Sequence, residues 1–188
     1  RMMITQATTY TIPASFTCPG QIMPTTRRAL IMNTAAISHP STNGYVTEIQ
    51  NALIAEGWQA ADIDTRSRQG DDDHSFTPLT MLNATGYGLV FVIAQGSRVD
   101  PGDGVQHAYL QCCRAGNITD VMQPEQWLAM IGERNDGRLI RCQTATESGG
   151  FVNEVYARDD LLTEQMSLDN GTLVYFISPN SRTVSDGM

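Results

Sequence analysis

The strongest constraint on the fold is an unbroken apolar run, Tyr87-Gly-Leu-Val-Phe-Val-Ile-Ala94, which contains no charged residue. A run of this length, rich in β-branched and aromatic residues, is typical of a strand that is buried on both faces. Two further runs share this character, Arg28-Ala-Leu-Ile-Met-Asn33 and Thr172-Leu-Val-Tyr-Phe-Ile-Ser178. Such strands belong to parallel sheets, in which other layers cover both faces. The three runs therefore predict the centre of an α/β domain.

The segments between the first two runs have the length and pattern of a helical crossover. Ser41-Thr-Asn-Gly44 can cap a helix whose inward stripe is Val46, Ile49 and Leu53. A short strand is expected at 59–64, and a short helix from about Pro78 to Ala84. This order of strand and helix predicts parallel pairing with right-handed crossovers.

The second half of the chain is expected to extend the same sheet. Its predicted elements are one arm of a small edge hairpin at 107–116, a helix at 124–134, a strand at 138–144 and a helix that opens at Gly149-Gly150, contains Phe151 and Val155, and either continues or restarts through Leu161 to Met166. The complete prediction is a mostly parallel sheet of about five strands in a flavodoxin-like order, with helices on both faces and an edge hairpin.

Composition divides the chain into two regions. Residues 1–26 are rich in Thr, Pro and Ser, with short extended pieces such as Thr9 to Ile12, and are expected to be an arm or the end of a preceding module. Residues 27–188 are expected to be the α/β domain. Since the chain opens at Arg1 without a charged and apolar leader, we expect it to be a fragment of a longer protein or a processed form.

Charge and motif content exclude several classes of partner. Twelve basic residues, all of them Arg, stand against twenty acidic ones and give a net charge of −8, which disfavours a nucleic-acid partner. The apolar runs are too short for a membrane span. No CxxC pair or HExxH motif points to a metal, and neither a Walker A motif nor GxGxxG points to a nucleotide, so no cofactor is expected. The compartment and the oligomeric state are left open by the sequence.

Functional groups of an α/β sheet gather beyond the carboxyl ends of its strands. Three such ends can be identified, Ala94–Ser97, Thr144–Gly150 and Ser178–Ser185. The segments Val92-Ile-Ala-Gln-Gly96 and Gln143-Thr-Ala-Thr-Glu-Ser-Gly-Gly-Phe151 resemble the two active-site motifs of the caspase, legumain and gingipain type of cysteine peptidase. Gln95 and Thr146 are 51 positions apart, close to the spacing of about 50 between the His and Cys of caspases.

The resemblance implies a caspase-like fold whose catalytic dyad is missing. The His position is occupied by Gln95 and the Cys position by Thr146, and neither residue supplies a proton shuttle or an activated nucleophile near neutral pH. The glycine frame is kept, so Gly96, Glu147, Ser148 and Gly149 are expected to present donors to a bound carbonyl. The loop from Ser178 to Ser185 is similar to the segment that lines the specificity pocket in these enzymes. The resemblance thus implies a catalytically impaired relative that binds or scaffolds a peptide or partner protein.

Two other functions are compatible with the sequence. Gln111-Cys-Cys-Arg-Ala-Gly116 is similar to the caspase motif around the nucleophile, with one extra residue. An active cysteine peptidase would then use Cys112 or Cys113 with His107 or His39. The third alternative is a ligand-binding flavodoxin-like module, which has no phosphate-binding motif in its favour and rests on fold analogy.

Overall fold

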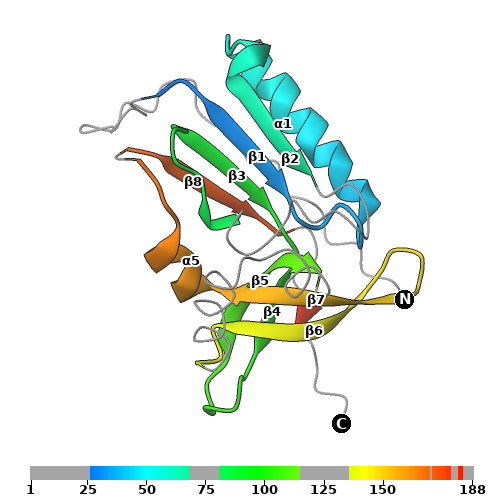
Figure 1. Cartoon of the computed structure of the whole chain (residues 1–188). Helices are drawn as coiled ribbons and strands as arrows, with labels where there is room; N and C mark the ends of the chain where they lie inside the picture. The colour runs from blue at the N-terminus through cyan, green and yellow to red at the C-terminus, as the bar shows by residue number, and fades with distance from the viewer. Residues whose placement is uncertain (1–25, 68–80, 115–135, 170, 179–181, 184–188) are drawn as a thin grey trace, which may run out of the picture.

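The structure is a computed structural model, and it describes residues 26–67, 81–114, 136–169, 171–178 and 182–183. These residues form two separate sheets (Figure 1). The first sheet is parallel and has the strand order β2-β1-β3-β8. Its strands are β1 (Ala29–Asn33), β2 (Ile63–Ser67), β3 (Leu89–Ile93) and β8 (Leu173–Ile177).

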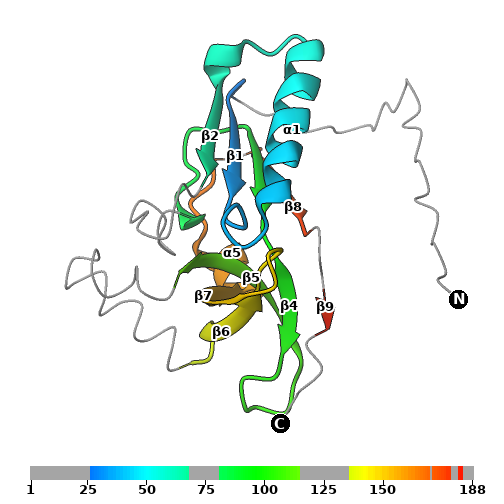
Figure 2. The same cartoon turned by 90° about the vertical axis from the view of Figure 1, so that its right-hand side faces the viewer.

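The second sheet has five strands in the order β6-β7-β5-β4-β9. They are β4 (Gly96–Val99), β5 (His107–Arg114), β6 (Leu139–Ala145), β7 (Phe151–Arg158) and β9 (Arg182–Thr183). Neighbouring strands are antiparallel except for the β4–β9 pair. In Figure 2 β4 continues in the direction of β3, while β6 and β7 run across it.

Few helices accompany these sheets in the described ranges. They are the 3₁₀ turns η1 (Pro40–Thr42) and η2 (Ala60–Asp62), the helix α1 (Asn43–Ala55) and the short helix α5 (Asp159–Gln165), and Met81 and Leu82 are also helical. None of these described helices is long and apolar enough to cross a membrane. The predicted fold class is wrong, because a mostly antiparallel second sheet stands where helices on both faces of one parallel sheet were expected.

The error arises mainly at Gly149-Gly150, where a helix was expected. Gly149 has a φ of +84°, a conformation that suits glycine, and it forms a tight turn between β6 and β7. β7 then pairs with β6 on one side and with β5 on the other. The hairpin arm predicted at 107–116 also belongs to this second sheet, as β5, and not to the edge of the parallel one.

Several local predictions are confirmed. The three apolar runs contain β1, β3 and β8, and α1 begins at Asn43 as its sequence pattern indicates. The strand expected at 59–64 begins later, at Ile63, because η2 occupies the preceding residues. The arm at 1–25, the start of the helix near Pro78 and the helix at 124–134 lie outside the described residues.

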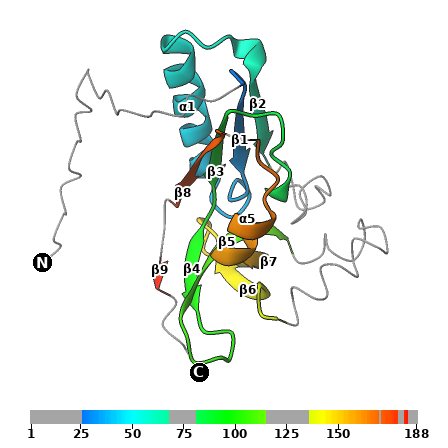
Figure 3. The same cartoon turned by 90° about the vertical axis from the view of Figure 1, so that its left-hand side faces the viewer.

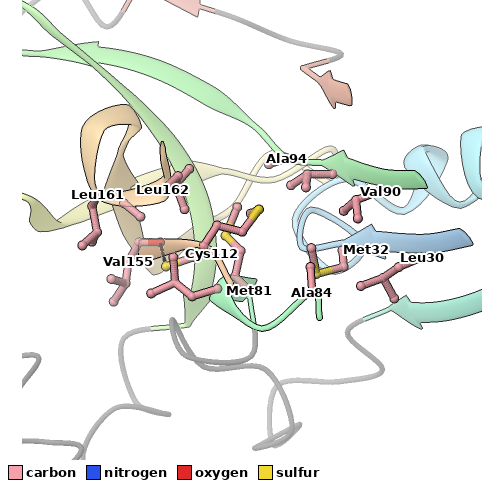
Figure 4. Packing of buried hydrophobic residues seen from close by; sticks show 14 of the residues in the cluster. Leu30, Met32, Met81, Ala84, Val90, Ala94, Cys112, Val155, Leu161 and Leu162 are labelled. Atoms are coloured by element: carbon pink, nitrogen blue, oxygen red, sulfur yellow. Dashed lines mark hydrogen bonds between the residues drawn. The ribbon is translucent and has the colours of Figure 1, made fainter. Parts of the chain in front are cut away.

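One apolar core joins the two sheets (Figure 4). The parallel sheet contributes residues such as Leu30, Met32 and Val90, and the second sheet contributes Cys112 and Val155. The helix α5 lies between the sheets (Figure 3) and adds Leu161 and Leu162, which are both fully buried. The core thus extends from one face of the parallel sheet to the second sheet and α5, which lie beyond the carboxyl ends of β1 and β3 (Figure 1).

The opposite face of the parallel sheet is covered by α1. A smaller cluster joins Ile31 of β1 and Ile93 of β3 to Val46 of the helix. Phe91 and Ile177 pack against this cluster while remaining partly exposed. The covering helix therefore protects the centre of the sheet better than its β8 side.

A polar cluster stabilises the amino ends of the parallel strands. Asp64 of β2 accepts hydrogen bonds from the Tyr87 hydroxyl and from Arg28, each at 2.6 Å. The bond from Tyr87, and then the charge of Arg28, hold the pKa of Asp64 below its usual value. Burial, followed by the bond to Asp64, raises the pKa of Tyr87. Arg28 also lies over the Tyr87 ring, with its guanidinium carbon 4.9 Å from the ring centroid.

The shared core predicts that a cavity in α5 destabilises the whole domain. Leu161→Ala is expected to lower the free energy of unfolding by about 2–5 kcal/mol, the usual cost of removing a fully buried leucine side chain. The matched control, Leu168→Ala, removes a side chain that is 41% exposed and is expected to cost about 0.5 kcal/mol or less. Urea unfolding followed by circular dichroism measures both, and equal losses would contradict this description of the core.

Candidate functional site

The carboxyl ends of β1 and β3 meet the second sheet at a seam of polar residues. The Thr34 hydroxyl donates to the Gln111 carbonyl at 2.7 Å, and the Thr34 amide donates to the Ile93 carbonyl at 3.0 Å. The Gln111 side-chain amide donates to the Ser38 hydroxyl at 3.1 Å, and His39 Nδ1 lies 3.1 Å from that hydroxyl. These contacts hold the loop after β1 against β3 and against β5, the central strand of the second sheet.

The turn between β6 and β7 closes over the same loop. The Glu147 amide donates to the Ser38 carbonyl at 3.0 Å, and the Glu147 carboxylate accepts from the Ser41 hydroxyl and, at 3.3 Å, from the Ser41 amide. The turn thus brings one predicted site residue, Glu147, to the start of the segment that leads into α1.

The amides around Thr146 are engaged within the turn itself. The Thr146 amide donates to the Gly150 carbonyl at 2.9 Å, and the Gly149 amide donates to the Thr146 carbonyl at 3.0 Å. The Gly150 amide donates to the Thr146 hydroxyl at 2.9 Å, and that hydroxyl lies 2.9 Å from the Ser148 hydroxyl. Together with the Glu147 amide, these bonds occupy four amides of the turn, those of Thr146, Glu147, Gly149 and Gly150, which a bound carbonyl would otherwise use.

Two predicted site residues meet where β3 passes into β4. The Gly96 amide donates to the Ser178 hydroxyl at 2.8 Å. A Cβ atom on Gly96 would lie only 2.8 Å from the same oxygen, so the contact leaves no room for a larger residue. Ser178 directly follows β8, and the bond therefore ties the ends of β3 and β8 together.

Gln95 and Thr146 are not joined by any hydrogen bond among the described residues. The Gln95 carbonyl accepts from the Gln111 amide at 2.9 Å, and Gln111 in turn contacts Ser38, whose carbonyl binds Glu147. Gln95 Oε1 is buried without a hydrogen-bond partner in the described part of the chain. The two positions thus border the loop after β1 from different strands, and Ser185 lies outside the described residues.

The described cysteine and histidine side chains have the following contacts. Cys112 is fully buried, and its thiol donates to the Val155 carbonyl at 3.2 Å. His39 Nδ1 lies 3.1 Å from the Ser38 hydroxyl. His107 Nε2 lies 2.7 Å from Asp103 at the other end of β5. The side chain of Cys113 is not described.

Metal binding and thiol reactivity find little support in the described ranges. Those ranges contain no group of three or more His, Cys, Asp or Glu side chains that could hold a metal ion. Burial raises the pKa of the Cys142 thiol, which keeps it protonated near neutral pH. A backbone bond from Val105 and the contact with His107 lower the pKa of Asp103.

An open cavity of about 580 Å³ lies away from the seam, between the β4–β5 turn and the start of β6. Its lining carries both signs of charge, because it includes Asp103, Asp136 and Arg141. Asp103 is already engaged by His107. No residue expected from the sequence to form a site lines this cavity.

The surface that sequence reasoning missed is the outer strand of the parallel sheet, β8. Leu173, Tyr175 and Phe176 are 42%, 50% and 45% exposed, although their run has the composition of a buried strand. Among the described residues, β8 pairs only with β3, so its other side is an edge (Figure 1). The one available signal was the position of this run at the end of the series of strands, which does not by itself specify an edge.

Comparison of the chain with protein-family models, with curated proteins and with solved structures yields no match. The function is therefore argued from the geometry of this chain.

The Gly96–Ser178 contact predicts a coupled pair of substitutions. Gly96→Ala is expected to lower the free energy of unfolding by about 1–3 kcal/mol, because its methyl group would overlap the Ser178 hydroxyl. Ser178→Ala, which removes the acceptor of the Gly96 amide, is expected to cost about 1 kcal/mol. The double variant should be clearly more stable than the sum of the single losses predicts, because the overlap is gone. Strict additivity in urea unfolding would show that the two residues are not in contact.

Proposed function

We propose that this chain is a non-catalytic binding domain that captures an extended polypeptide segment along the free side of β8. The observation that carries the proposal is the uncharged, half-exposed outer strand β8, which lies next to the largely buried strand β3. Strand addition of this kind uses main-chain hydrogen bonds for affinity and alternate side chains for specificity.

The backbone of β8 is oriented for such an addition. The Leu173 amide donates to the Gly88 carbonyl, and the Ala94 amide donates to the Ile177 carbonyl, each at 3.0 Å. With the register of the β3–β8 pair, these bonds direct the amide and carbonyl of Leu173, Tyr175 and Ile177 toward β3. The intervening residues, Val174 and Phe176, therefore direct their backbone groups outward, toward an incoming strand.

The side chains of β8 also favour an apolar partner segment. Tyr175 stacks on Phe91, with ring centroids 5.3 Å apart, and so presents a fixed aromatic surface beyond the part of the sheet that α1 covers. β8 contains none of the charged residues or prolines by which proteins commonly protect a sheet edge. An extended segment with apolar residues at alternate positions would cover this surface.

The side chains in and near the seam favour a non-catalytic role. The thiol of Cys112 is buried and hydrogen-bonded, so it cannot meet a substrate in this arrangement. Gln95 and Thr146 supply neither a proton shuttle nor an activated nucleophile. The likeness of their motifs to those of cysteine peptidases stays a prediction, and the binding proposal does not depend on it. An active peptidase would have to rely on Cys113.

A proline scan of β8 tests the proposed function. Extended peptides are first selected from a displayed library of random linear sequences on the wild-type chain. Phe176→Pro removes an outward amide and is expected to weaken capture by about tenfold or more. Phe176→Ala keeps that amide and is expected to weaken capture less, by the loss of side-chain contact alone.

Controls for folding accompany the proline scan. Phe176→Pro should keep the circular dichroism spectrum of the wild type, since proline is tolerated where the amide faces away from the sheet. Tyr175→Pro removes an amide that faces β3 and should lower the thermal midpoint strongly. Peptides that bind Phe176→Pro as well as they bind the wild type would refute strand addition at β8, and so would a failure to select any peptide on a chain that light scattering shows to be monomeric.

A further inference from the structure

We propose that the partner which β8 fits is a second copy of this chain, paired antiparallel across a twofold axis at Tyr175. This inference rests on the proposed function, because it uses the same edge, and it names the occupant. Two four-stranded sheets would join edge to edge into one continuous sheet of eight strands, a common size for sheets in proteins.

The sequence of β8 is chemically symmetric about its central residue. Leu173 and Ile177 are both aliphatic, Val174 and Phe176 are both apolar, and Tyr175 lies between them. An isologous interface places the same surface on both copies, so residue i of one meets residue j of the other and the reverse. With the axis at Tyr175, Leu173 faces the partner's Ile177 and Val174 faces the partner's Phe176, and every pairing is apolar.

The backbone orientation of β8 selects the same register. An antiparallel pair alternates between residues that exchange hydrogen bonds and residues that do not. Tyr175 already directs its amide and carbonyl toward β3, so it suits the non-bonded position on the axis. Val174 and Phe176 direct theirs outward, so each exchanges both bonds with the partner's Phe176 and the partner's Val174. If the register shifted by one residue, each residue with an outward amide and carbonyl would face a residue of the partner strand whose amide and carbonyl point toward β3. The two strands could then not exchange these hydrogen bonds.

The aromatic surface becomes continuous in this arrangement. Non-bonded pairs bring their Cα atoms to about 4.5 Å, which is the closest approach of side chains in a sheet. Tyr175 and the partner's Tyr175 would therefore be in contact, and each stacks on its own Phe91 at 5.3 Å between centroids. Four rings would form a row on the α1 side of the joined sheet and bury surface that is half exposed in the single chain.

Charge favours the antiparallel over the parallel arrangement. The chain carries a net charge of −8, yet β8 and its neighbours Thr172 and Ser178 are uncharged, so the two edges can approach without opposed like charges. The nearest charged residues in the sequence are Asp169 before the strand and Arg182 after it. Antiparallel pairing places the Asp169 end of one strand beside the Ser178 end of the other, away from the partner's Asp169. Parallel pairing would instead bring the two Asp169 ends together.

Site-specific disulfide formation tests both the pairing and its register. Tyr175→Cys places two thiols on the axis at a Cα separation compatible with a disulfide, and it is expected to form a covalent dimer under mild oxidation. Leu173→Cys alone should not, because it faces the partner's Ile177. A mixture of Leu173→Cys with Ile177→Cys should cross-link again. All variants keep the native cysteines, and the wild-type chain gives the background.

Light scattering on the wild-type chain completes the test. The mass is expected to rise with concentration from 20.6 kDa to twice that value, and Phe176→Pro is expected to stay at the lower value at every concentration. A wild-type mass that never rises, with Tyr175→Cys cross-linking no better than Leu173→Cys, would overturn the second copy as the occupant.

The two proposals fail in different ways. If the chain stays monomeric while Phe176→Pro still abolishes capture of selected peptides, the edge binds another protein and the second copy is wrong. If Phe176→Pro affects neither peptide capture nor mass, both proposals are wrong. If both hold, the selected peptides should compete with the second copy and return the mass to that of one chain.

Discussion

The apolar core between the two sheets is the interaction on which the rest of the structure depends. A parallel sheet needs cover on both of its faces, and α1 supplies that cover on one face only. On the other face, Leu30, Met32 and Val90 belong to the core that continues through Met81 and Ala84 to the second sheet and α5. The antiparallel sheet lies beyond the carboxyl ends of the parallel strands, and the shared core holds the two sheets together.

The polar seam also fixes the position of the edge strand, β8. β3 passes into β4 after two intervening residues, Ala94 and Gln95, and the bond from Gly96 to Ser178 holds the end of β8 beside this crossing. In the chain, β8 follows four strands of the second sheet and α5. In the parallel sheet, it takes the outermost position, next to β3. An apolar strand in that position has one paired side, and its open side is what makes a binding role for this chain physically reasonable.

Local elements of this fold could be predicted from the sequence, and their assembly could not. The runs around Ala29–Asn33, Leu89–Ile93 and Leu173–Ile177 are strands because apolar, β-branched composition over a short length specifies a strand wherever it lies. Composition does not specify strand order, so the apolar character of β8 indicated burial although the strand lies at an edge. The turn at Gly149 shows the same limit, because a glycine pair is compatible with a helix start or with a hairpin, and pairing with β5 decided between them.

The candidate site could also be predicted only in part from the sequence. Reasoning from strand ends grouped Gly96 with Ser178, and these two residues are hydrogen-bonded. It could not foresee that the amides around Thr146 would be engaged within their own turn, because those bonds depend on the local turn geometry. It also could not foresee the docking of Glu147 on Ser41, which are 106 residues apart in the chain.

Residue-resolved hydrogen exchange can test whether β8 has a free edge, because it reports which amides of the strand are hydrogen-bonded. In a dilute sample, we expect slow exchange at Tyr175 and Ile177, whose amides face β3, and fast exchange at Val174 and Phe176, whose amides face outward. Raising the concentration should slow the exchange of Val174 and Phe176 selectively as the edge is occupied. Uniform protection of all four amides in the dilute sample would show that β8 is already covered on both sides, and would contradict the free edge on which both proposals rest.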